Sequence, residues 1–120
     1  MQKRILVVDD DEMNLARTQL ILEGEYDVLL ADSGVRALHI LKTQKVDLVL
    51  LDIDMPLMNG METFERMKGF ASDVPVIFLT ASGDVGDVVG ALLLGAVNYL
   101  KKPCPPQELK KRVAQELDKK

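Results

Sequence analysis

The sequence has little of the side-chain chemistry on which several common kinds of site depend. Its 120 residues include one cysteine, Cys104, and one histidine, His39. A single cysteine excludes an internal disulfide and a thiolate cluster around zinc or iron and sulfur, and a single histidine excludes a multi-histidine metal site. No serine follows the strand-to-helix elbow pattern of a hydrolase. Any metal site in this chain must therefore be built from oxygen ligands.

Long apolar runs and an excess of positive charge are also missing. The N-terminus has only four strongly apolar residues before three aspartates, too few for a signal peptide or for a membrane span of about 20 residues. Fifteen basic and nineteen acidic residues leave a formal net charge of -4, which argues against binding a polyanion through the overall field. We expect a soluble, cytoplasmic protein with neither a membrane nor nucleic acid as a direct partner.

The chain shows no internal repeat, low-complexity tract or long linker. Nearly half of its positions, 48%, are hydrophobic. A chain of this size can bury roughly two thirds of its surface without disulfides or a structural metal. We therefore predict a single domain over residues 1–120.

Short apolar runs alternate with stretches of helical spacing. Three runs are apolar on both faces, as in the central strands of a parallel sheet; two more are shorter or mixed and suit edge strands. The central runs are residues 5–8, 48–51 and 76–79, and the edge runs are residues 28–31 and 98–100. Helix signals lie between them: N-caps at Asp11 and Ser33, a fourth helix after Asp84, and a last helix opened by Pro105 and Pro106. Five strands alternating with five helices predict an α/β fold with an open, doubly wound sheet and helices on both faces.

Polar side chains gather where four of these strands end. Asp9, Asp10 and Asp11 follow the first strand, Asp52 and Asp54 the third, Thr80 to Ser82 the fourth, and Lys101 to Pro103 the fifth. Ligands of such sheets bind beyond the carboxyl ends of the strands. Two carboxylates about 4 Å apart repel by roughly 4 kcal/mol at an effective dielectric of about 20. Several of them around one point therefore require a cation, which a divalent metal and a lysine would supply.

The ligand set indicates which metal and which chemistry to expect. Oxygen ligands in an open site favour Mg²⁺, and Mn²⁺ could substitute. A metal, a lysine and a hydroxyl around a carboxylate form the set needed to accept a phosphoryl group, whose transfer depends mainly on positioning and charge neutralisation. Asp52 is then the predicted nucleophile, forming an aspartyl phosphate.

The sequence resembles the response-regulator receiver domain, the phosphoacceptor module of two-component signalling, over essentially its whole length. Four segments match in family order and spacing: residues 5–10 (ILVVDD), 50–60 (LLDIDMP through Asn59-Gly60), 79–81 (LTA) and 95–103 (GA through YLKKP). Each would be weak alone, but four together at the ends of predicted strands are specific. With this resemblance we expect the flavodoxin-like strand order 2-1-3-4-5.

The resemblance implies a role for each matching position. Asp52 would be phosphorylated, Asp9 and Asp10 would hold Mg²⁺ with Asp52, and the backbone carbonyl of Asp54 would complete the protein ligands. Thr80 would donate its hydroxyl to the phosphoryl group and Lys102 would pair with it. Three details accompany these roles: a small Ala81 that admits a bulky donor, a cis peptide between Lys102 and Pro103, and a switch in which Thr80 moves toward the phosphate and Tyr99 turns inward.

The implied partners are a sensor histidine kinase or histidine phosphotransfer protein as donor, and an output domain or target protein as receiver of the signal. The surface of the fourth helix, fifth strand and fifth helix would carry that signal and could form a phosphorylation-dependent homodimer. The domain would catalyse its own phosphorylation and slower dephosphorylation without being a turnover enzyme. Gly86 and Gly90 should make the fourth helix easy to shift, since each costs about 1 kcal/mol relative to alanine.

Two other functions remain open at this point. The pair Asp52 and Asp54 also matches the nucleophile and acid/base of haloacid-dehalogenase-type phosphohydrolases, although that family places the pair after its first strand and usually has a cap. A receiver-like interaction module that is never phosphorylated is the other alternative. Asp54 has a further hypothetical role, since a carboxylate two residues after the acceptor could repel attacking water and alter the phosphate lifetime.

Overall fold

The structure is a computed structural model that describes residues 2–53, 55–80, 95, 98–102 and 104–118. Five strands are present: β1 (Arg4–Val8), β2 (Asp27–Ala31), β3 (Leu48–Asp52), β4 (Val76–Thr80) and β5 (Asn98–Lys101). The described helices are α1 (Glu12–Leu22), α2 (Gly34–Thr43), α3 (Gly60–Met67) and α5 (Pro106–Asp118). The helix expected after Asp84, with Gly86 and Gly90, lies outside the described residues.

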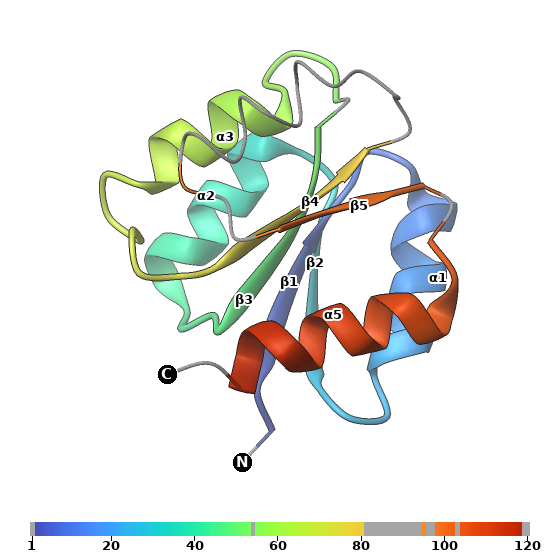
Figure 1. Cartoon of the computed structure of the whole chain (residues 1–120). Coiled ribbons are helices and arrows are strands. Elements are labelled where there is room, and N and C mark those ends of the chain that lie inside the picture. Colours follow the sequence, from blue (N-terminus) through green and yellow to red (C-terminus); the bar gives the residue numbers. More distant parts are fainter. Residues whose placement is uncertain (1, 54, 81–94, 96–97, 103, 119–120) are drawn as a thin grey trace.

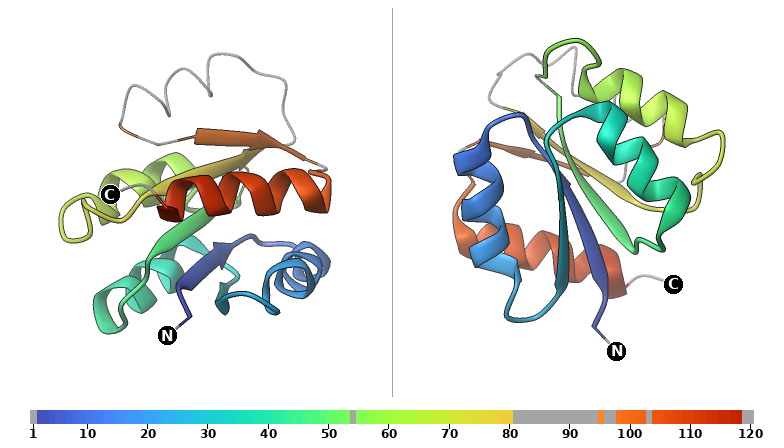
Figure 2. Two further views of the ribbon diagram at one scale, coloured as in Figure 1. Left: turned by 60° about the horizontal axis from the view of Figure 1, so that its bottom comes forward. Right: turned by 180° about the vertical axis from the view of Figure 1, so that it is seen from behind.

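All five strands pair in parallel, in the order β2-β1-β3-β4-β5. Helices cover both faces: α2 and α3 lie on one side of the sheet, and α1 and α5 on the other (Figures 1 and 2). The predicted fold class and strand order are confirmed. In such a sheet the strands all end at one edge, and β1 and β3, neighbours in the sheet, lead to helices on opposite faces. The functional residues are expected beyond that point.

The apolar runs form the strands because their alternate side chains enter two separate cores. One core, toward α2 and α3, contains Leu6, Leu51 and Phe78. The other, toward α1 and α5, contains Val7, Leu50 and Ile77. Every residue of β3 and β4 is buried, whereas β2 and β5 are partly exposed, as predicted for central and edge strands.

The helix starts follow the predicted caps in two cases. Asp11 accepts a hydrogen bond from the backbone N–H of Met13 at the start of α1, and Ser33 accepts one from Arg36 at the start of α2. These side chains satisfy backbone donors that a helix leaves unpaired in its first turn. The last predicted helix begins at Pro106, as expected, and buries Leu109 and Val113.

In two helices one large apolar residue faces solvent instead of the sheet. Leu20 of α1 is 72% exposed and Val35 of α2 is 65% exposed, while α1 buries Leu15 and Leu22. In α2 the buried residues are Gly34, Ala37, Ile40 and Leu41. Gly34 sets this face, because a Cβ at that position would overlap the hydroxyl of Thr63 in α3. In the described part of the chain, no helix has the length and apolar character that crossing a membrane requires.

Candidate functional site

The strand register brings the predicted site residues to one edge of the sheet. Asp52 is the last residue of β3 and pairs with Leu79, and Thr80 is the last residue of β4 and pairs with Lys101. Backbone hydrogen bonds continue just past the strands. The N–H of Asp9 donates to the carbonyl of Ala31 (3.1 Å), and the N–H of Lys102 donates to the carbonyl of Thr80 (2.7 Å). These bonds anchor the site on the rigid sheet.

Three carboxylates meet at this edge. Asp9, Asp10 and Asp52 each offer an oxygen, and these oxygens all lie within 4.8 Å of one another. Asp9 and Asp52 are only 2% and 4% exposed, whereas Asp10 faces solvent. Buried carboxylates this close need positive charge nearby. An all-oxygen set with one solvent-facing member fits a hard divalent cation that keeps some of its water.

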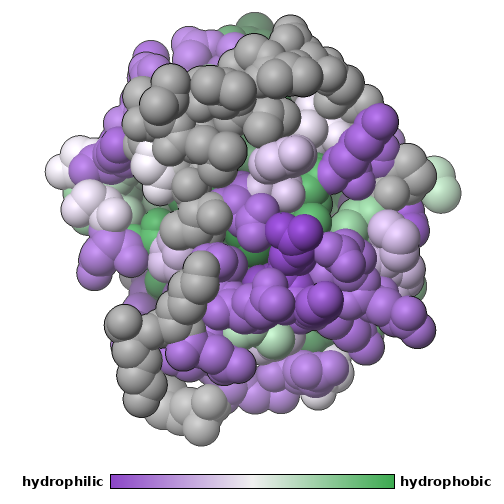
Figure 3. Space-filling view, viewed as in Figure 1, coloured by the Kyte–Doolittle hydropathy of each residue, from purple (hydrophilic) through white to green (hydrophobic). Residues whose placement is uncertain are grey.

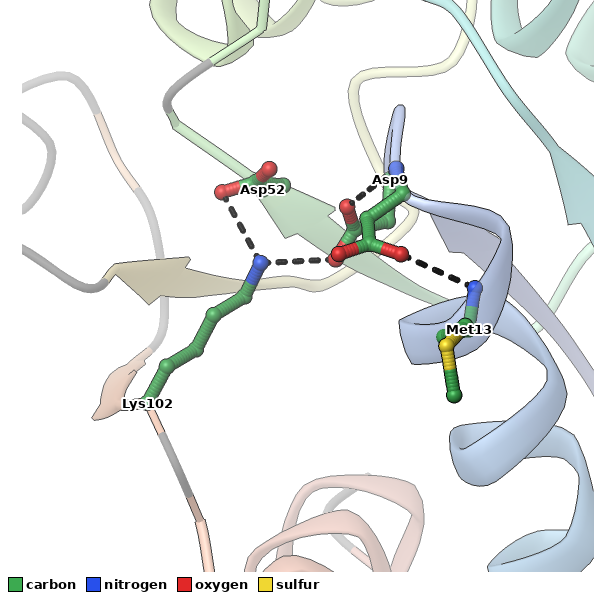
Figure 4. A network of polar contacts seen from close by, with 5 residues as sticks. Asp9, Met13, Asp52 and Lys102 are labelled. Carbon is green, nitrogen blue, oxygen red and sulfur yellow. Dashed lines mark hydrogen bonds and ion pairs between the residues drawn. The ribbon is translucent and has the colours of Figure 1, made fainter.

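Lys102 supplies part of that positive charge. Its Nζ lies 2.6 Å from Oδ2 of Asp9 and 3.3 Å from Oδ1 of Asp52, bridging the two acids (Figure 4). Burial lowers the pKa of Lys102, but the hydrogen bond to Asp9 and the charges of Asp52 and Asp9 outweigh it, so the net pKa is raised. Lys102 is therefore held as an ammonium between the two carboxylates.

The other oxygen of Asp9 holds the backbone at the start of α1. Oδ1 of Asp9 accepts a hydrogen bond from the N–H of Asp11 (2.9 Å), and Oδ1 of Asp11 accepts one from the N–H of Met13 (2.9 Å; Figure 4). Asp11 is thus a helix cap, and Asp9 belongs to the site. The N-terminus of α1 directs its positive dipole end toward the carboxylates.

The loop after Asp52 is shaped by a capping box. Oδ1 of Asn59 accepts a hydrogen bond from the N–H of Glu62 (2.9 Å), and the Glu62 carboxylate accepts one from the N–H of Asn59 (3.3 Å). The N–H of Gly60 donates to the carbonyl of Ile53 (3.0 Å), which closes the loop. The roles of Asn59 and Glu62 were missed, although an Asn followed three residues later by Glu is a helix-start signal that can be found in a sequence.

Thr80 and Tyr99 occupy different surroundings. Thr80 is buried at the end of β4, next to Lys101, whereas Tyr99 of β5 is 41% exposed. Tyr99 lines a pocket of about 480 Å³ between β5 and α5, whose wall includes Lys102 and Arg112. Over α5 the described surface is mainly hydrophilic (Figure 3).

Several predicted details cannot be followed in the structure. Asp54, Ala81, Ser82 and Pro103 lie outside the described residues. The metal-ligand role of the Asp54 carbonyl and the cis peptide before Pro103 therefore stay predictions.

Comparison with known proteins identifies the class that this fold and site define. A family model described as "Response regulator receiver domain" matches residues 5–114. The chain belongs to this family. It is a receiver domain of two-component response regulators, and a phosphoacceptor role follows from the family. The haloacid-dehalogenase-type alternative loses its basis, since Asp52 ends the third strand of a receiver fold.

The relatives and structural neighbours agree with this assignment. The chain is 40% identical to the alkaline phosphatase synthesis transcriptional regulatory protein PhoP of Bacillus subtilis, over 94% of this chain and 48% of that protein. It is 41% identical to the DNA-binding response regulator MtrA of Mycobacterium tuberculosis, over 94% of this chain and 50% of that protein. The chain thus spans about half the length of the curated relatives it matches. A CheY-like receiver domain of Methanospirillum hungatei superimposes with a TM-score of 0.94 at 34% identity, over 98% of this chain and 95% of that one.

Proposed function

We propose that Asp52 accepts a phosphoryl group from a phosphohistidine donor, with Asp9, Asp10, Asp52 and the backbone carbonyl of Asp54 holding Mg²⁺. The observation that carries this proposal is the close approach of three carboxylates and Lys102 at the carboxyl edge of the sheet. Mn²⁺, which also takes oxygen ligands, could replace Mg²⁺. The bound metal would neutralise charge on the phosphoryl oxygens during transfer.

The chain's own residues would share the work of the transfer. An oxygen of Asp52 forms the new bond to phosphorus while the bond between phosphorus and the donor imidazole nitrogen breaks, and that nitrogen keeps the electron pair. Lys102, already 3.3 Å from Asp52, would pair with the transferred group, and the hydroxyl of Thr80 would donate a hydrogen bond to it. Self-catalysed phosphorylation and slower loss of the phosphate, by attack of water, belong to the same proposal.

Phosphorylation would change the surface formed by the fourth helix, β5 and α5, and this surface would bind the recipient of the signal. Thr80 and Tyr99 are the proposed switch residues, since Thr80 lies at the site and Tyr99 stands exposed on the neighbouring strand. The aspartyl phosphate carries about two negative charges at pH 7, whereas the free Asp52 carboxylate carries one, and this added charge would bias an element with two arrangements. The matched relatives are about twice as long as this chain, which supports an output domain or a target protein as the recipient of the signal. The same surface would form a homodimer after phosphorylation.

The proposed donor is a sensor histidine kinase or a histidine phosphotransfer protein, and a cytoplasmic location is part of the same proposal. Relatives named as transcriptional or DNA-binding regulators support a regulatory output.

Asp54 would tune the phosphate lifetime. Replacement by Asn should then change the rate at which the phosphorylated protein loses its phosphate, and an unchanged rate would remove this role.

The proposal is tested by intact mass measurement after incubation with acetyl phosphate and Mg²⁺. The wild-type protein should gain the mass of one phosphoryl group. The gain should disappear in Asp52→Asn and after chelation of the metal. An Asp11→Asn variant serves as the matched control, because Asp11 caps α1 beside the cluster and its replacement should leave the gain intact. A wild-type protein that gains no mass would instead support the phosphorylation-independent interaction module.

A further inference from the structure

Lys102 contacts the two buried acids of the site unequally. Its Nζ is 2.6 Å from Asp9 but 3.3 Å from Asp52, so the shorter contact is to a proposed metal ligand and the longer one is to the proposed phosphoacceptor (Figure 4). A charge-assisted N–H···O bond has its usual length near 2.7–2.9 Å. The Asp9 contact is therefore a close ion pair, and the Asp52 contact is a looser one.

Both carboxylate oxygens of Asp9 are already engaged. Oδ1 accepts the N–H of Asp11 at 2.9 Å, and Oδ2 accepts the ammonium of Lys102. Asp9 is also only 2% exposed. An ammonium and a divalent cation on the same buried carboxylate would repel each other strongly, because little water lies between them to screen the charges. Asp9 can therefore serve a metal well only if Lys102 moves away from Oδ2.

The structure allows such a movement without a change in the sheet. The backbone N–H of Lys102 is held by the carbonyl of Thr80 at 2.7 Å, while its ammonium sits at the end of a flexible four-carbon stem. Only the side chain therefore has to shift for the ammonium to withdraw from Oδ2 of Asp9.

We propose that Lys102 is an internal counter-cation that competes with the divalent metal for Asp9, so that metal entry and the withdrawal of Lys102 from Asp9 are one coupled event. This inference rests on the proposed function, in which Asp9, Asp10 and Asp52 hold the metal. It adds that the lysine lowers the metal affinity of the resting protein.

The test compares two neighbouring lysines of the same chain. Lys102→Met keeps the apolar stem and removes the charge at the site. Lys101→Met removes an equal charge from the exposed position one residue earlier, outside the carboxylate cluster. Binding of Mn²⁺ is measured by electron paramagnetic resonance of the free ion and binding of Mg²⁺ by calorimetry, both at constant ionic strength and without a phosphodonor.

We expect Lys102→Met to bind either ion about tenfold more tightly than wild type, a size usual for two coupled binding events. Lys101→Met should bind much as wild type does. A Lys102→Arg variant, which retains the positive charge, should not reproduce the full gain. Equal or weaker metal binding by Lys102→Met would overturn the inference, and so would an equal gain in Lys101→Met.

Two further measurements keep the test decisive. Thermal unfolding in the presence of a chelator establishes that each variant is folded, and if Lys102→Met is not, Lys102→Gln replaces it. Asp10→Asn separates the inference from the proposed function. If Asp10→Asn weakens metal binding while Lys102→Met leaves it unchanged, only the competition is wrong. If Asp10→Asn binds metal as wild type does, the proposed metal site is wrong and the inference falls with it.

Discussion

Gly60 lies directly against the backbone of Asp52: a Cβ atom at position 60 would overlap the carbonyl oxygen of Asp52 and crowd the Cα of Ile53. The first residue of α3 thus touches the last residue of β3, and the loop between them is closed by the hydrogen bond from Gly60 to Ile53. Asp52 can hold this position because residue 60 is a glycine and has no Cβ atom.

The first prediction follows from this contact. Gly60→Ala should destabilise the protein by about 1–3 kcal/mol, because the neighbour is backbone that cannot move aside cheaply. Gly24→Ala is the matched control, since a Cβ there meets nothing within 4 Å. It should be neutral or stabilising by up to about 1 kcal/mol. Urea unfolding of the two variants checks both values, and equal midpoints would contradict the proposed contact.

The capping box of α3 gives a second prediction. Asn59→Ala removes the acceptor of the Glu62 N–H and should cost about 1 kcal/mol of unfolding free energy. Glu62→Gln keeps a side-chain acceptor for the N–H of Asn59 and should cost much less. Chemical denaturation measures both. A larger loss in Glu62→Gln than in Asn59→Ala would show that the carboxylate charge, rather than the cap, holds the helix start.

Much of the fold could be predicted because the central strands are apolar on both faces, a pattern that few other structures produce. The apolar runs stop one residue before the strands end at Asp52 and Thr80, because polar side chains interrupt the apolar run while the backbone ladder continues. The exposure of Val35 in α2 could not be predicted, since it depends on how closely Gly34 packs against Thr63 and Met58, where a Cβ atom would overlap.

The candidate site, too, could be predicted from the sequence only in part. The ends of parallel strands must share an edge, so the meeting of Asp9, Asp52 and Lys102 follows from topology even though Asp9 and Lys102 are 93 positions apart. Which acid Lys102 approaches more closely does not follow, because it depends on side-chain rotamers in the folded site. This preference for Asp9 is the observation on which the competition with metal depends.

The third prediction concerns the thiol of Cys104. Burial and the nearby Glu108 carboxylate raise the pKa of Cys104 above the ordinary value of a thiol, against the opposing charges of Arg17 and Arg112. The thiolate is the reactive form. Alkylation by iodoacetamide at neutral pH should therefore be slower than that of a free thiol. Glu108→Gln should accelerate alkylation, and Lys111→Gln, a charge change on the same helix that is not among these causes, should not. A rate for wild type equal to that of the free thiol would contradict the raised pKa.

The last prediction tests the Lys102 ion pairs through alkaline pH. The pKa of Lys102 is raised above 10.5 in the folded protein, so the folded state binds this proton more tightly than the unfolded chain does. The stabilisation from the ion pairs is then fully present below about pH 10.5 and is lost as the pH rises through the folded pKa. The free energy of unfolding of wild type should exceed that of Lys102→Met by a constant amount between about pH 7 and 9 and by less above that range. Lys101→Met, which removes a lysine outside the carboxylate cluster, should differ little from wild type throughout. Urea unfolding in a chelating buffer measures all three, and a difference between wild type and Lys102→Met that grows at high pH would show that the ammonium does not stabilise the metal-free site.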